Sequence, residues 1–382
     1  MTKKPLSLAK NGKIEIRNKL GITKDNLADI YTPGVAEVVK EIMKHPAKVY
    51  QYTWKKRSVA IVSDGSAILG LGNQGPEAAL PVMEAKAVLF KELANIDAVP
   101  IVLRTQNPDE IVQIIKNISP TFGGINIEDI AAPGCFLIKE QLKKELDVPV
   151  FHDDQYGTAI VVLAGLINAC RVVNKKLEKT KIIISGAGAA GIATAKMLHK
   201  YGCRNIILFD SLGSLYRGRS QQMNFAKMRI AQKTNPFKFN GPIQEALSGA
   251  DIFIGLSRGG LLKAADIEKM SPRSIVFALA NPTPEIMPKD ARKAGAEVIA
   301  TGRSDFSNQI NNALVFPGIF KGALDTGTVL ITDDIKQKIA LAIAKIIKKP
   351  DRFNIIPGVL NKKVVKTIVN VFKTEKSSPS KK

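Results

Sequence analysis

The stretch KIIISGAGAAGIATAKMLHK, residues 181–200, decides the fold of this chain. A run of β-branched residues ends at Ser185, and a helical pattern begins a few residues later. Between them stand three glycines in the spacing GxGxxG. Gly186 permits a tight turn, Gly188 leaves the backbone open to close approach, and Gly191 lets helix and strand pack closely. This strand–turn–helix unit predicts a doubly wound, Rossmann-type α/β domain.

The same turn predicts a dinucleotide site, with the pyrophosphate at the positive end of the helix. The next predicted strand ends in Asp210, roughly 20 residues beyond the last glycine, where an acid can accept from a ribose 2′-hydroxyl. This favours NAD, but NADP stays possible because Arg217 and Arg219 could contact a 2′-phosphate. A glycine-rich turn without a ligand is the alternative. The backbone expected at the cofactor comprises Gly186, Gly188, Ala189, Ala190 and Gly191.

From Ser58 onward, β-branched runs alternate with helical patterns, which is typical of parallel sheets covered by helices. We expect two domains, an N-terminal α/β domain over residues 1–156 and the Rossmann-type domain with C-terminal helices over residues 157–382. The expected strands are 58–63, 98–103, 123–127, 148–151, 181–185, 205–209, 251–255, 274–279 and 296–301. The expected helices are 77–94, 108–118, 133–146, 157–174, 188–201, 286–294, 332–347 and 358–373.

The amino-acid composition indicates in which compartment the protein functions and which partners it binds. It has 382 residues, is 45% hydrophobic and carries a net charge of +22, a field that attracts anions of every kind. The basic residues are spread along the chain, so we expect no dedicated nucleic-acid partner. The first 20 residues lack the apolar core of a signal peptide, and the longest apolar run, 159–169, is too short for a membrane span. Cys135, Cys170 and Cys203 form no CxxC pair, as expected of reduced thiols in a cytoplasmic protein.

Pairs of acids follow two predicted strands directly. Glu128 and Asp129 follow one strand, and Asp153 and Asp154 follow the next one along the chain, after His152. Ligands of open α/β sheets lie outside the carboxyl ends of the strands, so the four acids should face one crevice and repel one another there. Mg²⁺ or Mn²⁺, which prefers carboxylate oxygens, would resolve this repulsion. The alternative is that Glu128 and Asp153 cap the helices that follow them.

Two further residues are candidates for proton transfer. Lys86 lies in the middle of the apolar stripe of helix 77–94, with Val82 and Phe90 one turn away on either side. A desolvated lysine has a lowered pKa and can act as a base, whereas a lysine that reaches solvent from the edge of the stripe would not. Tyr31 precedes a Pro-Gly turn, which could leave its phenol at a loop tip, although a packing tyrosine is the alternative.

Together these motifs resemble the small, bacterial-type malic enzymes, the NAD(P)-dependent malate dehydrogenases that decarboxylate. The resemblance implies oxidative decarboxylation of (S)-malate to pyruvate and CO2 with a divalent metal, and also decarboxylation of oxaloacetate. The similar segments run over most of the chain in the family's order. They are YTPGVA (31–36), SDGSAILGLGNQGPEAALPVMEAKAVLFK (63–91), GGINIEDIAAPGCF (123–136), PVFHDDQYGTAIV (149–161), GAGAAGIA (186–193), ALANPTPEI (278–286) and FSNQINNALVFPGIFKGALD (306–325).

The resemblance also implies residue roles. Lys86 matches the base that takes the proton from the C2 hydroxyl of malate, Tyr31 matches the acid that protonates C3, and Asp153 lies close to the lysine. A homodimer is implied as well, in which the N-terminal segment crosses to the partner so that Tyr31 serves the neighbouring site. The other residues implied are the metal ligands Glu128, Asp129 and Asp154, the substrate-binding residues Asn281 and Asn312, and Asn281 and Asn311 beside the cofactor.

The sequence departs from the family pattern in places. Tyr156 stands where members commonly have histidine, and Ser307 stands where a proline is usual. The larger eukaryotic-type enzymes carry an arginine after the SDG-like segment, where Ser66 and Ala67 stand here. Ser66 and the asparagines are therefore the candidates for binding the substrate carboxylate.

Two other classes stay open at this stage. Another two-domain NAD-dependent dehydrogenase, such as an amino-acid dehydrogenase, would share the GxGxxG and a lysine but needs no metal, so its activity would survive EDTA. A basic nucleic-acid-binding protein that keeps an enzyme fold would bind DNA with a steep salt dependence and form no NADH.

Overall fold

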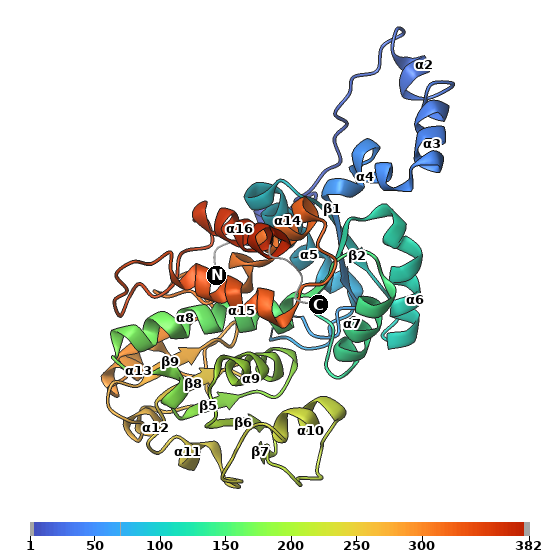
Figure 1. The fold of residues 1–382 in the computed structure, drawn as a ribbon. Coiled ribbons are helices and arrows are strands. Elements are labelled where there is room, and N and C mark those ends of the chain that lie inside the picture. The colour runs from blue at the N-terminus through green and yellow to red at the C-terminus, as the bar shows by residue number, and fades with distance from the viewer. Residues whose placement is uncertain (1–3, 69, 378–382) are drawn as a thin grey trace.

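The computed structural model describes residues 4–68 and 70–377, and they form one parallel and one mixed sheet with helices around them (Figure 1). The first sheet has four parallel strands in the order β2-β1-β3-β4. Each of its strands was predicted to within two residues, because each lies in a short apolar run bounded by turn signals. The strands are β1 (Ser58–Ser63), β2 (Asp97–Val102), β3 (Gly124–Ile127) and β4 (Val150–His152).

The second sheet has six strands in the order β10-β9-β8-β5-β6-β7. All of its pairings are parallel except that of β7 with β6, so the predicted doubly wound fold is confirmed. The two-residue strand β7 is too short to give a sequence pattern and was not predicted. The strands are β5 (Ile182–Ser185), β6 (Ile206–Asp210), β7 (Gly213–Ser214), β8 (Ile252–Gly255), β9 (Ile275–Ala278) and β10 (Val298–Thr301).

The helices begin where local chemistry favours them. Helix α6, for example, begins with Pro108, and the side chain of Asn107 accepts from two backbone N–H groups of its first turn. The eight predicted helices are present as α5 (Pro76–Ala94), α6 (Pro108–Ile118), α7 (Gly134–Glu145), α8 (Thr158–Val172), α9 (Ala189–Tyr201), α13 (Pro288–Lys293), α15 (Asp333–Ala344) and α16 (Lys363–Ser377). Unpredicted helices include α3 (Val35–Lys44), α10 (Phe225–Ala231) and α14 (Phe316–Thr326).

One apolar helix connects the two sheets. Strand β4 leads through a single π-helical turn, η4 (Asp153–Gly157), directly into α8. The window Asp153–Val172 is long and apolar enough to cross a membrane by length and composition, yet 78% of it is buried inside the protein, as in a core helix. The buried Asn168 of α8 donates to the carbonyls of Ala344 and Ile355, which ties α8 to the C-terminal part of the chain.

The C-terminal helices reach back to the first sheet. The ring of Phe316 in α14 lies 4.7 Å from that of Phe90 in α5, centroid to centroid. Phe320 lies 6.2 Å from Phe151 of β4, edge to face. Residues beyond 157 therefore help to build the core beneath β4 and α5, and the division of the chain between residues 156 and 157 stays a prediction.

An N-terminal arm projects away from this body (blue in Figure 1). It leaves the body beside α5, where the backbone N–H of Lys13 donates to Glu84, and it carries α2 (Leu27–Ile30) and α3 before returning at α4 (Val49–Tyr52). Every residue of α2 and α3 is at least partly exposed, including the apolar Val39 and Met43. The arm thus presents apolar side chains that no element among the described residues covers.

Candidate active site

The candidate site lies at the carboxyl ends of β1, β3 and β4. The chain leaves β1 toward β2 on one side and reaches β3 on the other, so β1 and β3 flank a switch point, where open α/β sheets bind ligands. Asp64 follows β1, Glu128 and Asp129 follow β3, and Asp153 follows β4. The topology therefore collects acids at one edge of the sheet.

Three acids at this edge converge. One carboxylate oxygen from each of Glu128, Asp129 and Asp154 lies within 4.8 Å of the other two. The backbone N–H of Asp129, which has a positive φ of 50°, donates to Asp154 Oδ2 at 2.9 Å, and Asn126 donates to Glu128 Oε2 at 3.1 Å. The first interaction holds two of the acids close together in spite of their charge, and the second fixes the position of the Glu128 carboxylate.

The electrostatics of this cluster suit a divalent cation. Burial raises the pKa of Glu128 well above its usual value, and the neighbouring Asp154, Asp153 and Asp129 raise it further, while Lys86 opposes them. A hard cation such as Mg²⁺ or Mn²⁺ would replace this repulsion with attraction, and oxygen donors are the ligands it prefers. The three converging carboxylates therefore fit a divalent metal ion.

Lys86 is buried within the cluster. Its Nζ donates to Asp153 Oδ2 at 2.5 Å and lies 3.0 Å from Glu128 Oε1 and 4.3 Å from the ring centre of Phe316. Burial alone would lower the pKa of Lys86, but the adjacent Asp153, Glu128 and Asp154 raise it above its ordinary value. The sequence-based expectation of a lowered pKa is wrong for the protein alone, because the apolar stripe of α5 gives no information about acids on other elements. The alternative of a solvent-reaching lysine is wrong too.

Asp153 owes its place to the π-helical turn. A Cβ on Gly157 would lie 1.9 Å from Asp153 Oδ1, so the turn accepts Asp153 only because residue 157 is glycine. In the described structure neither Asp153 nor Glu128 caps a helix, since α8 continues directly from η4 and α7 follows Pro133. Burial raises the pKa of Asp153 to about 6, against the opposing effect of Lys86.

The structure adds two residues that sequence reasoning missed. His152 is fully buried, its Nδ1 lies 3.8 Å from Asp154 Oδ2, and neither ring nitrogen makes a hydrogen bond within the described residues. Burial lowers the pKa of His152 to about 4, so the ring is neutral. Asp64 accepts from the backbone and hydroxyl of Ser66, whose Oγ also accepts from Ala131 N–H at 2.8 Å. Ser66 therefore joins the loops after β1 and β3. His152 could have been suspected, because it directly precedes the two acids.

The glycine-rich turn fits a bound pyrophosphate. Gly186 has a φ of 108°, and a Cβ on Gly191 would lie 1.7 Å from the Gly186 carbonyl oxygen. A Cβ on Gly188 would meet nothing within 4 Å, so space remains above the turn at the beginning of α9, where Ala189 and Ala190 start the helix. This open space over a helix N-terminus is where a dinucleotide phosphate binds.

The asparagines lie where the two domains meet. A Cβ on Gly70 would lie 2.0 Å from the Asn281 carbonyl oxygen, and a crevice of about 370 Å³ opens beside this contact. Asn312 adjoins η4, since a Cβ on Gly157 would lie 2.9 Å from its Cβ. Asn311 caps the next short helix through Ala313 N–H at 2.8 Å.

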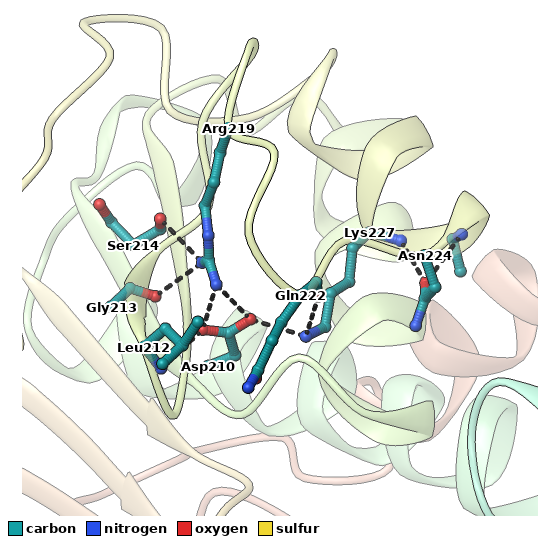
Figure 2. Close-up of polar contacts among 9 residues, drawn as sticks. Asp210, Leu212, Gly213, Ser214, Arg219, Gln222, Asn224 and Lys227 are labelled. Carbon is teal, nitrogen blue, oxygen red and sulfur yellow. Dashed lines mark hydrogen bonds and ion pairs between the residues drawn. The ribbon is translucent and has the colours of Figure 1, made fainter.

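Asp210 is not an open carboxylate. Figure 2 shows Arg219 and Lys227 converging on it, with Arg219 Nη2 at 2.8 and 2.9 Å from its two oxygens and Lys227 Nζ at 2.6 Å. These three side chains are at most 14% exposed. Burial would raise the pKa of Asp210, but the hydrogen bonds from Lys227 and Arg219 lower it. Arg217 is exposed and lies outside this cluster.

Tyr31 is the one predicted catalytic residue that a single chain does not bring to the site. It is 69% exposed and directly follows α2. Helix α2 belongs to the projecting arm and lies far from α5 (Figure 1). The alternative of a packing tyrosine is therefore wrong within one chain.

Comparisons with known proteins identify the family. Residues 11–143 match the model of the malic enzyme N-terminal domain, and residues 155–374 match that of the malic enzyme NAD binding domain. The chain is 50% identical to a bifunctional malic/malolactic enzyme of Bacillus subtilis over 94% of this chain and 87% of that protein. It is 52% identical to an NAD-dependent malic enzyme of Geobacillus stearothermophilus, over 94% and 75%. The crystal structure of a malic enzyme from Pyrococcus horikoshii superposes with a TM-score of 0.92 at 48% identity, over 98% and 90%. The chain belongs to the malic enzyme family.

Proposed function

We propose that this malic enzyme converts (S)-malate to pyruvate and CO2 with reduction of NAD(P), and that it also decarboxylates oxaloacetate. The observation that carries the proposal is the buried Lys86–Asp153 pair beside three converging carboxylates. An amino-acid dehydrogenase needs a lysine and a dinucleotide, but it has no use for a buried set of oxygen donors. This arrangement disfavours that alternative.

Glu128, Asp129 and Asp154 would hold Mg²⁺ or Mn²⁺. When bound, the cation polarises the C2 oxygen of the substrate and stabilises the negative charge that develops as CO2 leaves. The neutral ring of His152 lies near Asp154, with Nδ1 3.8 Å from its Oδ2, and adds no charge to the ligand set.

Lys86 would take the proton of the C2 hydroxyl as hydride leaves C2 for the nicotinamide. For this it must give up a proton, and its raised pKa opposes that step in the protein alone. A cation that neutralises Glu128 and Asp154 removes two of the charges that raise this pKa, and leaves Asp153 as the partner that positions Nζ. A bound cation would therefore favour the neutral form of Lys86, which can accept this proton.

Tyr31 would supply the proton to C3 after CO2 leaves, from a second copy of the chain. Support comes from the exposure of Tyr31, from the apolar side chains that α3 presents to solvent and from the separation of α2 from α5 (Figure 1). A homodimer in which each arm crosses to the other body would cover the apolar face of α3 and complete both sites. Malate is the small-molecule partner of each site.

NAD is the proposed cofactor, with NADP also accepted. An acid at the end of β6 favours NAD, and Asp210 is in that place. Because Arg219 and Lys227 already neutralise it, repulsion of a 2′-phosphate should be weak, so the preference should be modest. We also propose the cytoplasm as the compartment, supported by three free, buried cysteines.

The test is an absorbance assay for NADH with malate and Mn²⁺, run beside a pyruvate assay. We expect NADH and pyruvate in equal amounts, and loss of both after treatment with EDTA. Turnover that survives EDTA, or NADH without pyruvate, would refute the proposal. DNA binding without NADH formation would favour the nucleic-acid class instead.

A further inference from the structure

A second crevice, of about 170 Å³, lies between the two domains outside the catalytic site. Its walls come from α7 and η4 on the side of the first sheet and from α9 and α10 on the side of the second. Its apolar lining includes the buried Phe136, Ile192 and Ile230. Gln155 and Tyr156, which line it too, directly follow the acids Asp153 and Asp154 in η4.

Four cations and a single acid line this crevice, namely Lys139, Lys196, Arg229 and Lys233 with Glu140. Lys139 pairs with Glu140 at 2.6 Å, and Lys196 pairs with Asp333 at 2.9 Å. Within the part of the chain that the structure describes, Arg229 and Lys233 make no ion pair. The rim therefore keeps positive charge that no neighbouring acid balances.

The inner wall also carries a buried cation. Lys139 is 6% exposed, and its Nζ donates to the phenol oxygen of Tyr156 at 2.9 Å. The Nζ of Lys336 lies 3.5 Å from the centre of the same ring, on the side of the C-terminal helices. Burying an ammonium group is costly unless it finds partners, and here Tyr156 supplies one. The inner wall of the crevice is therefore cationic as well as apolar.

The dimensions and the charge restrict what the crevice can hold. A cavity of about 150 Å³ lined by apolar side chains takes up benzene, so this one suits a ligand of about that size. The cationic rim favours a ligand with an anionic group. The apolar lining favours a ligand whose remaining part is compact and uncharged. Malate, a dicarboxylate, would place one of its charges against Phe136 and Ile192.

We propose that this crevice is a binding site for a small monocarboxylate with an apolar body, separate from the catalytic site. Its carboxylate lies between Arg229 and Lys233 at the rim, and its body lies against Phe136, Ile192 and Ile230. The rings of Phe136 in α7 and Phe225 in α10 already meet edge to face at 6.1 Å, so an occupant extends an existing contact between the two domains. Its binding favours the arrangement in which α7 and α10 are close.

The test uses benzoate as the probe and its neutral analogue benzamide as the control, with binding followed by calorimetry on the full chain. Malate, Mn²⁺ and NADH are present in excess, so that the substrate and cofactor sites are both occupied and no turnover occurs, because NADH cannot accept a hydride from malate. We expect saturable binding of one benzoate per chain, at least about tenfold tighter than benzamide, because a charge-assisted hydrogen bond distinguishes the two.

A matched pair of variants locates the site. The double substitution Arg229→Gln with Lys233→Gln should weaken benzoate binding by at least about tenfold. Both side chains are exposed, so the fold should tolerate the change. The control, Lys366→Gln with Lys373→Gln on the exposed face of α16, removes the same charge elsewhere and should bind benzoate like the parent.

Three outcomes would overturn the proposal. The first is a failure of benzoate to saturate below about 10 mM. The second is an equal affinity for benzamide. The third is an equal loss in both double variants, which would mean that benzoate responds only to the net charge of the protein. Because binding is measured without turnover, these outcomes are independent of whether the proposed reaction is correct.

Discussion

Lys86 Nζ lies 2.5 Å from Asp153 Oδ2, and both side chains are buried. The two residues come from different elements, α5 and η4, so the ion pair joins the helix that carries the proposed base to the turn that carries a proposed metal ligand. Removing one partner of a buried pair typically costs about 3–5 kcal/mol, because the other charge is left without compensation. Stability and chemistry therefore depend on the same contact.

Lys86→Ala should lower kcat for malate oxidation by at least about 100-fold, the lower bound for loss of a general base. The measurement is NADH formation at saturating malate, with NAD binding followed by fluorescence to show that the variant is folded. Lys91→Ala is the control, since Lys91 lies on the same helix but is largely exposed. If Lys86→Ala oxidises malate at the parent rate, the base is another group, and Asp153 is the first to examine.

Asp154→Ala and Asp129→Ala should each abolish turnover while leaving NAD binding largely intact. The parent should also gain thermal stability with Mn²⁺, by about 2.7 kcal/mol at 100 times the dissociation constant, and neither variant should. The measurement is the melting temperature across a Mn²⁺ titration. Full activity of either variant in chelator-treated buffer would remove the metal hypothesis.

Tyr31→Phe should slow pyruvate formation from oxaloacetate, because it removes the proton donor for C3. If the arm crosses to the partner, mixing Tyr31→Phe with Lys86→Ala chains should restore activity, since one site of each mixed dimer has both groups. Random mixing predicts recovery of about a quarter of the parent activity. If each site used its own Tyr31, every site in the mixture would be defective and no activity would return.

Asp210→Ser should weaken the binding of NAD. It should also shift the cofactor preference toward NADP, because Arg219 and Lys227 lose the acid that neutralises them. A charge-assisted hydrogen bond of about 1.5–3 kcal/mol corresponds to roughly a ten- to hundredfold change. The measurements are kcat/KM and the dissociation constants for both cofactors, with Asp109→Ser, at an exposed acid of α6, as the control. An unchanged ratio would show that the Asp210 cluster does not contact the ribose.

The three cysteines should be unreactive in the native protein. Burial raises the pKa of Cys135, Cys170 and Cys203 to about 12 each, so almost no thiolate exists at pH 8. A thiol reagent should label them only at the rate of unfolding, and all three should react at once in denaturant. Rapid labelling of any one at pH 8 in the folded protein would contradict this.

Strand ends made much of the site predictable. Because β-branched runs give the ends of β3 and β4, the acids that follow them could be assigned to one edge of the sheet before any coordinates were known. The protonation state of Lys86 could not be inferred from strand ends, because its pKa depends on acids 42 and 67 positions away along the chain. Asp210 shows the same limit, since Lys227 reaches it from α10, a helix that the sequence pattern did not reveal.

The direct passage of β4 through η4 into α8 has a further consequence. The proposed ligand Asp154 and the buried Asn168 belong to one continuous segment, which packs with the first sheet at one end and with α9 and α15 along its length. Neither half of the molecule can then melt without exposing the apolar flank of this shared segment. We expect one cooperative unfolding transition for each chain in calorimetry. Metal binding at Asp154 should raise the melting temperature of the nucleotide domain as much as that of the N-terminal domain.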